Sequence, residues 1–166
     1  TVPDKWFSQN GWRGDKDKNL PAFHLAHKVY PDKKWYVLLD DDTYIFLDNF
    51  ALFTGRHSSP EEMARPLYTG KVFYASHCGP YGKDGFHKDS RGLPRLTFAH
   101  GGSGIVINAA TLNAMFPSIP ECVTKYSSCW AGDIQVAFCL NDLGIRSKQY
   151  NDGKRYEKHF TPFAPS

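Results

Sequence analysis

Blocks of apolar and polar positions along the chain predict alternating helices and strands. Apolar residues recur with helical spacing over 21–30, where Pro21 suits the first turn of a helix and Pro31 ends it. The next apolar run, 35–39, has no polar alternation, which is typical of a strand that is covered on both faces. A second helix is expected over 47–53.

The rest of the chain continues this alternation. The expected elements are a short helical turn over 61–63 that begins at Ser59 and Pro60, a strand over 67–75, a loop rich in glycine and proline over 76–95, strands over 96–99 and 104–107, a helix over 109–116 capped by Asn108, a helix over 133–143, and a strand-like piece from Gly144 onward. Helices that alternate with strands predict an α/β layer architecture. We expect one domain over 1–166, because this length suits a single core.

The composition excludes several classes of protein. A hydrophobic fraction of 41% and an aromatic fraction of 15% are too high for a disordered chain. The formal charge of +3 comes from 20 basic and 17 acidic residues without a basic tract, so nucleic acid is not an expected partner. No stretch approaches the roughly 20 apolar residues of a transmembrane segment. The first residues resemble no signal peptide, as expected of an excised or processed segment.

The four cysteines are Cys78, Cys122, Cys129 and Cys139. No two of them form a C-x-x-C pair, so a structural zinc site is not expected. An even number is compatible with one or two disulfides, and every pairing stays open, as does the alternative of buried free thiols. Disulfides would favour a secretory compartment.

Three consecutive carboxylates, Asp40, Asp41 and Asp42, directly follow the expected strand over 35–39. Like charges this close must spread apart, take up a proton or share a cation. Hard divalent cations such as magnesium and manganese prefer oxygen ligands, so we interpret the cluster as a candidate metal site. The alternative is a solvated acidic turn that closes the strand.

Further candidates for binding or catalysis lie later in the chain. In the Gly-Gly-Ser-Gly run over 101–104, glycine allows the backbone to approach a ligand closely, although a tight turn between two strands explains it equally well. Asp133, three residues after Trp130, is either a helix N-cap or a general base that faces a sugar. His159 is either a structural residue or a neutral ligand for an acidic metal site.

In this order, the segments 35–44, 98–107 and 132–136 resemble the fringe-like glycosyltransferases of family 31, especially core 1 β-1,3-galactosyltransferase-like members. The resemblance extends from about Trp12 to His159. It implies a GT-A fold, which is a Rossmann-like mixed sheet flanked by helices. Little of the strand–helix unit that precedes the acidic motif in such enzymes is visible here, so its absence from this chain is one expectation.

The resemblance also implies an activity. Such enzymes transfer a hexose from a UDP-sugar, with inversion, to a hydroxyl of a glycan or glycoprotein acceptor, here with a β-1,3 linkage. Direct displacement needs one base at the acceptor hydroxyl and positive charge at the departing UDP. Asp133 would be that catalytic base, and Trp130 would form a wall of the acceptor site. The implied location is the secretory pathway, in the Golgi lumen, or outside the cell.

Metal and donor ligands follow from the same resemblance. Manganese, or another divalent cation, would be held by Asp40, Asp42 and His159, with Asp42 as the direct ligand expected first. Asp41 would orient the donor or its ribose. The donor-binding residues implied are Asp40, Asp41, Gly101 and Gly102.

Two other interpretations stay open. Haloacid-dehalogenase-like phosphatases also begin with an aspartate pair after a buried strand, but Tyr44 and Ala137 stand where that family's motifs want different residues. The second is a shortened, catalytically inactive relative that binds sugar or metal as an interaction module. Metal-dependent UDP binding without hydrolysis or transfer would indicate the module.

Overall fold

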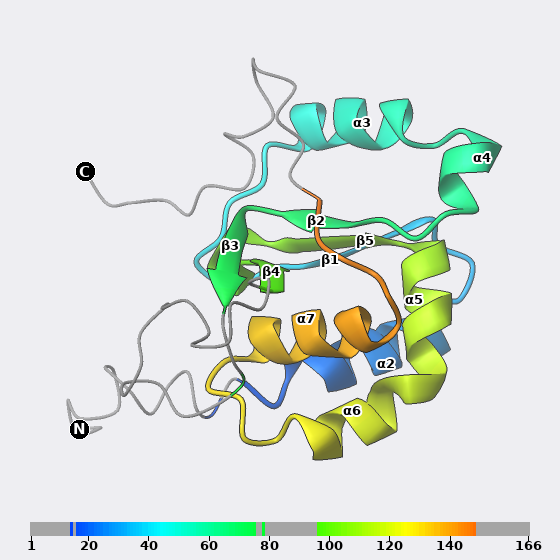
Figure 1. Ribbon diagram of the computed structural model, residues 1–166. Helices are drawn as coiled ribbons and strands as arrows, with labels where there is room; N and C mark the ends of the chain where they lie inside the picture. Colours follow the sequence, from blue (N-terminus) through cyan, green and yellow to red (C-terminus); the bar gives the residue numbers. More distant parts are fainter. Residues whose placement is uncertain (1–13, 15, 76–77, 79–95, 149–166) are drawn as a thin grey trace, which may run out of the picture.

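The computed structural model describes residues 14, 16–75, 78 and 96–148 (Figure 1). Its elements in chain order are α2 (Asn19–Val29), β1 (Trp35–Leu38), α3 (Leu47–Arg56), α4 (Pro60–Met63), β2 (Tyr68–Gly70), β3 (Val72–Ala75), β4 (Leu96–Ala99), the 3-10 helix η2 (Gly101–Ser103), β5 (Ile105–Asn108), α5 (Ala109–Met115), the 3-10 helix η3 (Phe116–Ser118), α6 (Ile119–Lys125) and α7 (Gly132–Asp142). The expected alternation of helices and strands is confirmed.

Two small antiparallel sheets form the centre of the fold. One has the strand order β1-β5-β2, and the other pairs β3 with β4. Figure 1 shows α3 on one side of the larger sheet and α2 and α7 on the opposite side. This confirms the predicted α/β layers. The mixed Rossmann-like sheet is not seen among the described residues, where the one parallel pairing is an isolated bridge between Thr69 and Lys148.

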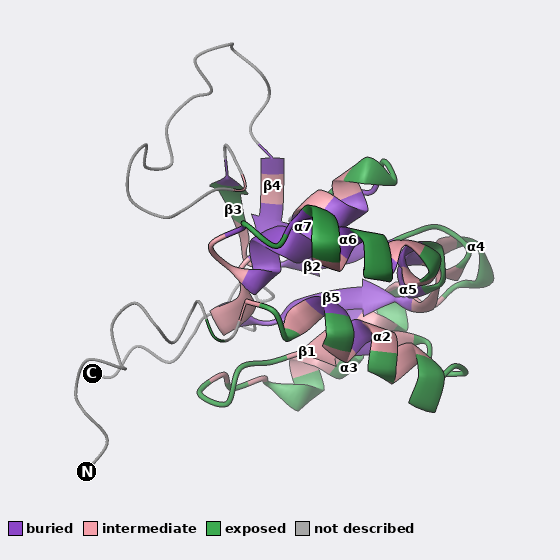
Figure 2. Ribbon diagram, turned by 90° about the horizontal axis from the view of Figure 1, so that it is seen from below, coloured by how far each residue is buried: buried purple, intermediate pink, exposed green. Residues whose placement is uncertain are grey.

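Strand β5 divides the core between the two faces of the larger sheet. Its residues are all buried (Figure 2), and successive side chains of a strand point to opposite faces. Ile105 and Ile107 therefore join the large cluster between the sheet and helices α2 and α7. Val106 points to the other face and packs with Phe53 of α3 and Leu67. An apolar strand without alternation is what a central position between two helical layers requires.

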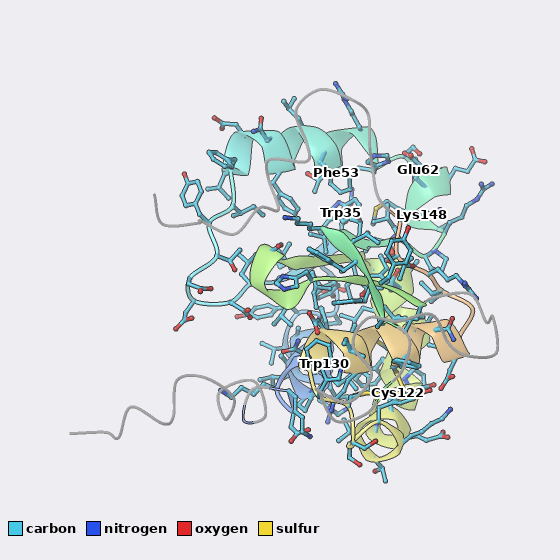
Figure 3. All side chains as sticks on the ribbon, turned by 60° about the vertical axis from the view of Figure 1, so that its left-hand side comes forward. Trp35, Phe53, Glu62, Cys122, Trp130 and Lys148 are labelled. Atoms are coloured by element: carbon cyan, nitrogen blue, oxygen red, sulfur yellow. A yellow bond between two sulfur atoms is a disulfide. The ribbon has the colours of Figure 1, made fainter. Side chains whose placement is uncertain are left out.

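The same expectation is confirmed only in part for β1. Tyr36 and Leu38 pack with the large cluster and Trp35 and Val37 pack with the cluster around Phe53, so both faces are covered. The strand nevertheless lies at the edge of its sheet, and Tyr36 is its one buried residue. The strand ends at Leu38, and Leu39 is 37% exposed. Trp35 still packs edge-on against the ring of Phe53, with ring centroids 5.7 Å apart (Figure 3). The apolar residues of this run thus reflect packing against the helical layers and not a central position in the sheet.

The single strand expected over 67–75 is also a correction, because it divides into β2 and β3, which belong to different sheets. The division falls at Gly70. A Cβ built there would lie 2.5 Å from the carbonyl oxygen of Gly104 and 2.8 Å from the Cβ of Ala99. Glycine therefore permits the close backbone approach at which the chain passes from one sheet to the other.

Helix starts match the sequence more closely than strands do. The Ser59 hydroxyl accepts a hydrogen bond from the Glu62 N–H at 3.3 Å, and Pro60 occupies the first position of α4. The Asn108 side chain caps α5 by accepting from the Thr111 N–H at 3.0 Å. Helix α6 was not predicted, since no side chain caps its start as Asn108 caps that of α5.

Both cysteine pairs are disulfides, which selects one of the pairings left open by the sequence. Cys122 of α6 is bonded to Cys139 of α7, and Cys78 is bonded to Cys129 just ahead of α7. The bond between Cys78 and Cys129 links the segment that leads into α7 to a residue 51 positions earlier in the chain. Two disulfides are consistent with the secretory pathway. Across the described ranges, none of the helices has the length and apolar content to cross a bilayer.

Candidate active site around Asp133

Three segments singled out by the sequence meet at one place. The loop after β1 carries Asp40, η2 carries the glycine pair, and the first turn of α7 carries Asp133. The Gly101 N–H donates to Asp133 Oδ2 at 2.8 Å. From the position of a Cβ built on Gly102, Asp40 Oδ2 is 3.6 Å away. The glycine turn therefore lies between the two carboxylates. The fold brings these predicted residues to one place, and their roles in binding and catalysis stay predictions.

Asp133 is a buried carboxyl group that is only 8% exposed. Oδ2 accepts from the Gly101 N–H, and Oδ1 accepts from the Ile134 N–H at 2.8 Å. Burial raises the pKa of Asp133 above its ordinary value, and the nearby charge of Asp40 adds to this rise. The two backbone hydrogen bonds oppose this rise in the pKa of Asp133, as does the positive charge that His100 carries when both of its ring nitrogens are protonated. A carboxylate with a raised pKa is a stronger base than an ordinary one.

Asp133 is not the N-cap of α7. That position belongs to Ala131, which has no side chain able to cap the helix. Asp133 instead lies inside the first turn and joins the start of α7 to the glycine turn of η2 through its Oδ2 atom. Its side chain thus acts as a structural link, and the lone pairs not engaged by the two N–H groups are free to accept a further proton.

The acidic cluster forms an exposed turn at the end of β1. Asp40, Asp41 and Asp42 are all exposed, and the Thr43 N–H donates to the Asp40 carbonyl at 3.1 Å. The Thr43 hydroxyl donates to the Gly102 carbonyl at 3.1 Å. This bond fixes the acidic turn beside the glycine turn. The sequence suggests Thr43 as a residue of the acidic turn, but its bond to the glycine turn could not be predicted, because Gly102 is distant in the chain.

A metal fits this turn by the chemistry of its donors. Exposed carboxylate oxygens are what a hard divalent cation prefers, and such ions commonly take one or two carboxylates together with phosphates. Within the described part of the chain, no three His, Cys, Asp or Glu side chains converge on one point as a ready-made site. The predicted third ligand, His159, lies outside the described residues. The metal assignment of Asp40 and Asp42 therefore stays a prediction.

Trp130 lies directly ahead of α7 and is half-buried (Figure 3). It packs against the large core cluster and follows Cys129, which the disulfide holds. Its place next to the first turn of α7 is near Asp133 in sequence and structure. Its packing against the core says nothing about an acceptor, so the predicted contact of Trp130 with the acceptor stays a prediction.

Two further residues lie next to the candidate site. Tyr68 of β2 is fully buried, and its hydroxyl accepts from the Ala99 N–H at 2.8 Å. Burial raises the pKa of Tyr68 well above its usual range, so the phenol stays neutral. The second residue is His100, which follows Ala99 and precedes the glycine pair. Neither residue was singled out from the sequence, because an interior tyrosine and a lone histidine most often serve packing.

The residue before Asp133 is Gly132, and the structure shows why a side chain does not fit there. A Cβ at this position would lie 2.7 Å from the Lys16 carbonyl oxygen and 2.8 Å from Cγ of Asn19. The start of α7 thus packs its backbone directly on the segment that leads into α2. This close contact sets the distance between the first turn of α7 and the segment before α2, and with it the position of Asp133.

Comparison with known proteins agrees with this arrangement. The Fringe-like family matches residues 18–152, so the chain belongs to the Fringe-like family and the predicted resemblance is confirmed. The chain is also 28% identical over 149 residues to glycoprotein-N-acetylgalactosamine 3-beta-galactosyltransferase 1 of Xenopus laevis. The aligned region covers 89% of this chain and 35% of that relative, so the chain spans about a third of the relative's length.

Proposed function

We propose that this protein is a metal-dependent, inverting glycosyltransferase that moves a hexose from a UDP-sugar to an acceptor hydroxyl. The observation that carries the proposal is the meeting of the acidic turn, the glycine turn and a buried carboxylate in a member of the Fringe-like family. Each of these parts suits one need of the reaction: holding a cation, approaching the donor, and accepting a proton.

Asp133 is the proposed catalytic base. Inversion by direct displacement requires one group that takes the proton of the acceptor hydroxyl as the new bond to the anomeric carbon forms and the bond to UDP breaks. The raised pKa of Asp133 supports this role, because it makes the carboxylate a better proton acceptor at neutral pH. Its two backbone hydrogen bonds hold the carboxylate plane in a fixed direction.

The acidic turn is the proposed metal and donor site. Asp40 and Asp42 would hold manganese or another divalent cation, together with His159, and Asp41 would orient the donor. A cation so bound supplies Lewis-acid stabilisation of the departing UDP. Gly101 and Gly102 would lie against the donor sugar and its phosphates.

The finer features of the proposal come from the family relationship. The relative named above is a 3-beta-galactosyltransferase that acts on glycoprotein N-acetylgalactosamine. A β-1,3 linkage formed on a glycan or glycoprotein, within a GT-A fold in the Golgi lumen or outside the cell, is the corresponding proposal here. Trp130 would wall the acceptor side of the site.

A specific observation favours a second candidate function. Both oxygens of Asp133 already accept backbone N–H groups, so this carboxylate serves the fold whether or not it serves catalysis. A catalytically inactive relative that binds a UDP-sugar or a metal, and acts as an interaction module, would keep the same link. Only turnover separates the two.

The test is hydrolysis of UDP-galactose and other UDP-hexoses in the presence of manganese, with the released UDP as readout. Wild-type protein is expected to turn over, and Asp133→Asn is expected to bind UDP but lose turnover. Asp48→Asn, an exposed aspartate in the first turn of α3, is the matched control and should behave as wild type. Metal-dependent UDP binding without turnover by the wild-type protein would favour the interaction module.

A further inference from the structure

His100 lies next to the candidate site but has no role in the proposed reaction as described above. It directly precedes η2 and is half-buried beside the glycine turn. Its imidazole lies on the same side of Gly102 as Asp40, because a Cβ built on Gly102 would be 3.1 Å from Cε1 of His100 and 3.6 Å from Oδ2 of Asp40. The imidazole therefore lies close to the space between the acidic turn and the glycine turn.

His100 is held in place through both its backbone and its ring. The backbone N–H of His100 donates to the Lys71 carbonyl at 2.9 Å. The ring of Phe73 lies against the imidazole, with ring centroids 5.1 Å apart. Nδ1 lies 3.4 Å from the hydroxyl of Ser103. A ring fixed in this way adds little ordering cost when a ligand binds to its remaining edge.

The tautomer of His100 follows from the burial of Ser103. The Ser103 side chain is 1% exposed, and Nδ1 of His100 is its one hydrogen-bond partner within the described residues. If Nδ1 carried the proton, the hydroxyl hydrogen of Ser103 would be buried without an acceptor, which is costly. Ser103 therefore donates to Nδ1, and the proton of the neutral imidazole lies on Nε2.

The Nε2–H group is left available to a ligand. No described residue accepts a hydrogen bond from Nε2, and the Gly102 N–H likewise has no partner among them. Two donors thus lie next to a turn that bears three carboxylates. Donors suit an anion, which in this setting is a group that arrives with its own cation.

We propose that His100 donates its Nε2–H to a diphosphate oxygen of the UDP-sugar, and so fixes the donor beside Gly102. This inference rests on the proposed function, since it takes the donor class from it. His100 is here a binding residue for the donor and not a metal ligand, because a protonated Nε2 has no lone pair for a cation.

The experiment measures UDP affinity by calorimetry in saturating manganese. His100→Ala is expected to weaken UDP binding by about 10- to 100-fold, the value of one hydrogen bond to a charged group. His100→Gln, whose amide keeps a donor of similar reach, is expected to recover most of the loss. His24→Ala removes an imidazole of α2 that stacks on Phe116, and as the matched control it should leave UDP affinity unchanged.

Competition assays identify the part of the ligand that His100 contacts. Inorganic pyrophosphate should compete with UDP less well in His100→Ala than in the wild type, whereas uridine should compete equally in both. Binding of manganese alone, followed by electron paramagnetic resonance, should be the same in both proteins. Weaker manganese binding in His100→Ala would make the residue a metal ligand and overturn the proposal.

The outcomes separate this inference from the proposed function. Wild-type protein that fails to bind UDP with manganese would remove both. UDP binding that is strong in the wild type and equal in His100→Ala would remove only the role of His100. Loss of affinity in both His100→Ala and His100→Gln, with an unchanged unfolding midpoint, would show that the donated hydrogen bond is not the cause.

Discussion

Replacing Gly132 by alanine tests whether the close contact at the start of α7 positions Asp133. The new Cβ would lie 2.7 Å from the Lys16 carbonyl oxygen, 2.8 Å from Cγ of Asn19 and 2.9 Å from Nδ2 of Asn19. Real Cβ atoms do not approach other atoms so closely. The Asn19 side chain can turn away, but the carbonyl of Lys16 is backbone, so α7 or the segment before α2 must move.

The magnitude follows from two opposing effects. Alanine favours a helix over glycine by up to about 1 kcal/mol, and somewhat less in the first turn. Overpacking of a close contact costs about 1 to 3 kcal/mol. Because the obstacle is backbone, the steric effect is expected to exceed the helix propensity. Gly132→Ala should therefore lower the free energy of unfolding by about 1 to 2 kcal/mol and displace Asp133.

Urea unfolding followed by circular dichroism measures this effect. Gly55→Ala is the matched control, because this glycine lies within α3 and a Cβ there would meet nothing within 4 Å. The control should raise the free energy of unfolding by about 0.5 to 1 kcal/mol. The same substitution is thus expected to have opposite signs at the two sites. A Gly132→Ala protein that is as stable as Gly55→Ala would refute the reasoning.

Three other predictions concern the core, the metal and the disulfides. Tyr68→Phe leaves the buried Ala99 N–H without its acceptor, so the free energy of unfolding should fall by about 1 to 3 kcal/mol in urea titrations. An unchanged midpoint would mean that the N–H finds another acceptor. Asp42→Ala should abolish manganese-dependent UDP binding in calorimetry, and unchanged affinity would defeat the metal assignment. Replacing both Cys122 and Cys139 by alanine opens a link across 17 residues and should cost about 3 kcal/mol of stability, measured by thermal unfolding; equal stability would show that packing alone joins α6 to α7.

The sequence predicts the helices of this fold better than its strands. Ser59 and Asn108 mark helix starts through local side-chain hydrogen bonds, and such contacts depend only on neighbours in the chain. The place of a strand in a sheet depends on distant partners. The apolar run over 35–39 therefore does not reveal that β1 is an edge strand, and Gly70 does not announce a change of sheet.

The candidate site shows the same division. The aspartates and glycines were identified because their residue types carry chemistry and their order resembles a family. The contacts that hold them together were not, since the bond from Thr43 to Gly102 and the support of Tyr68 arise only in the fold. His100 was passed over because a lone histidine has no distinctive pattern, and only its neighbours give it a role.

The most direct test of the account is a crystal structure with UDP and manganese, with anomalous scattering recorded at the manganese edge. We expect an anomalous peak between the carboxylates of Asp40 and Asp42 and the diphosphate, with Asp133 on the other side of the glycine turn that contacts the donor. Ordered UDP without a peak at the acidic turn, or a peak at a distant surface, would contradict it.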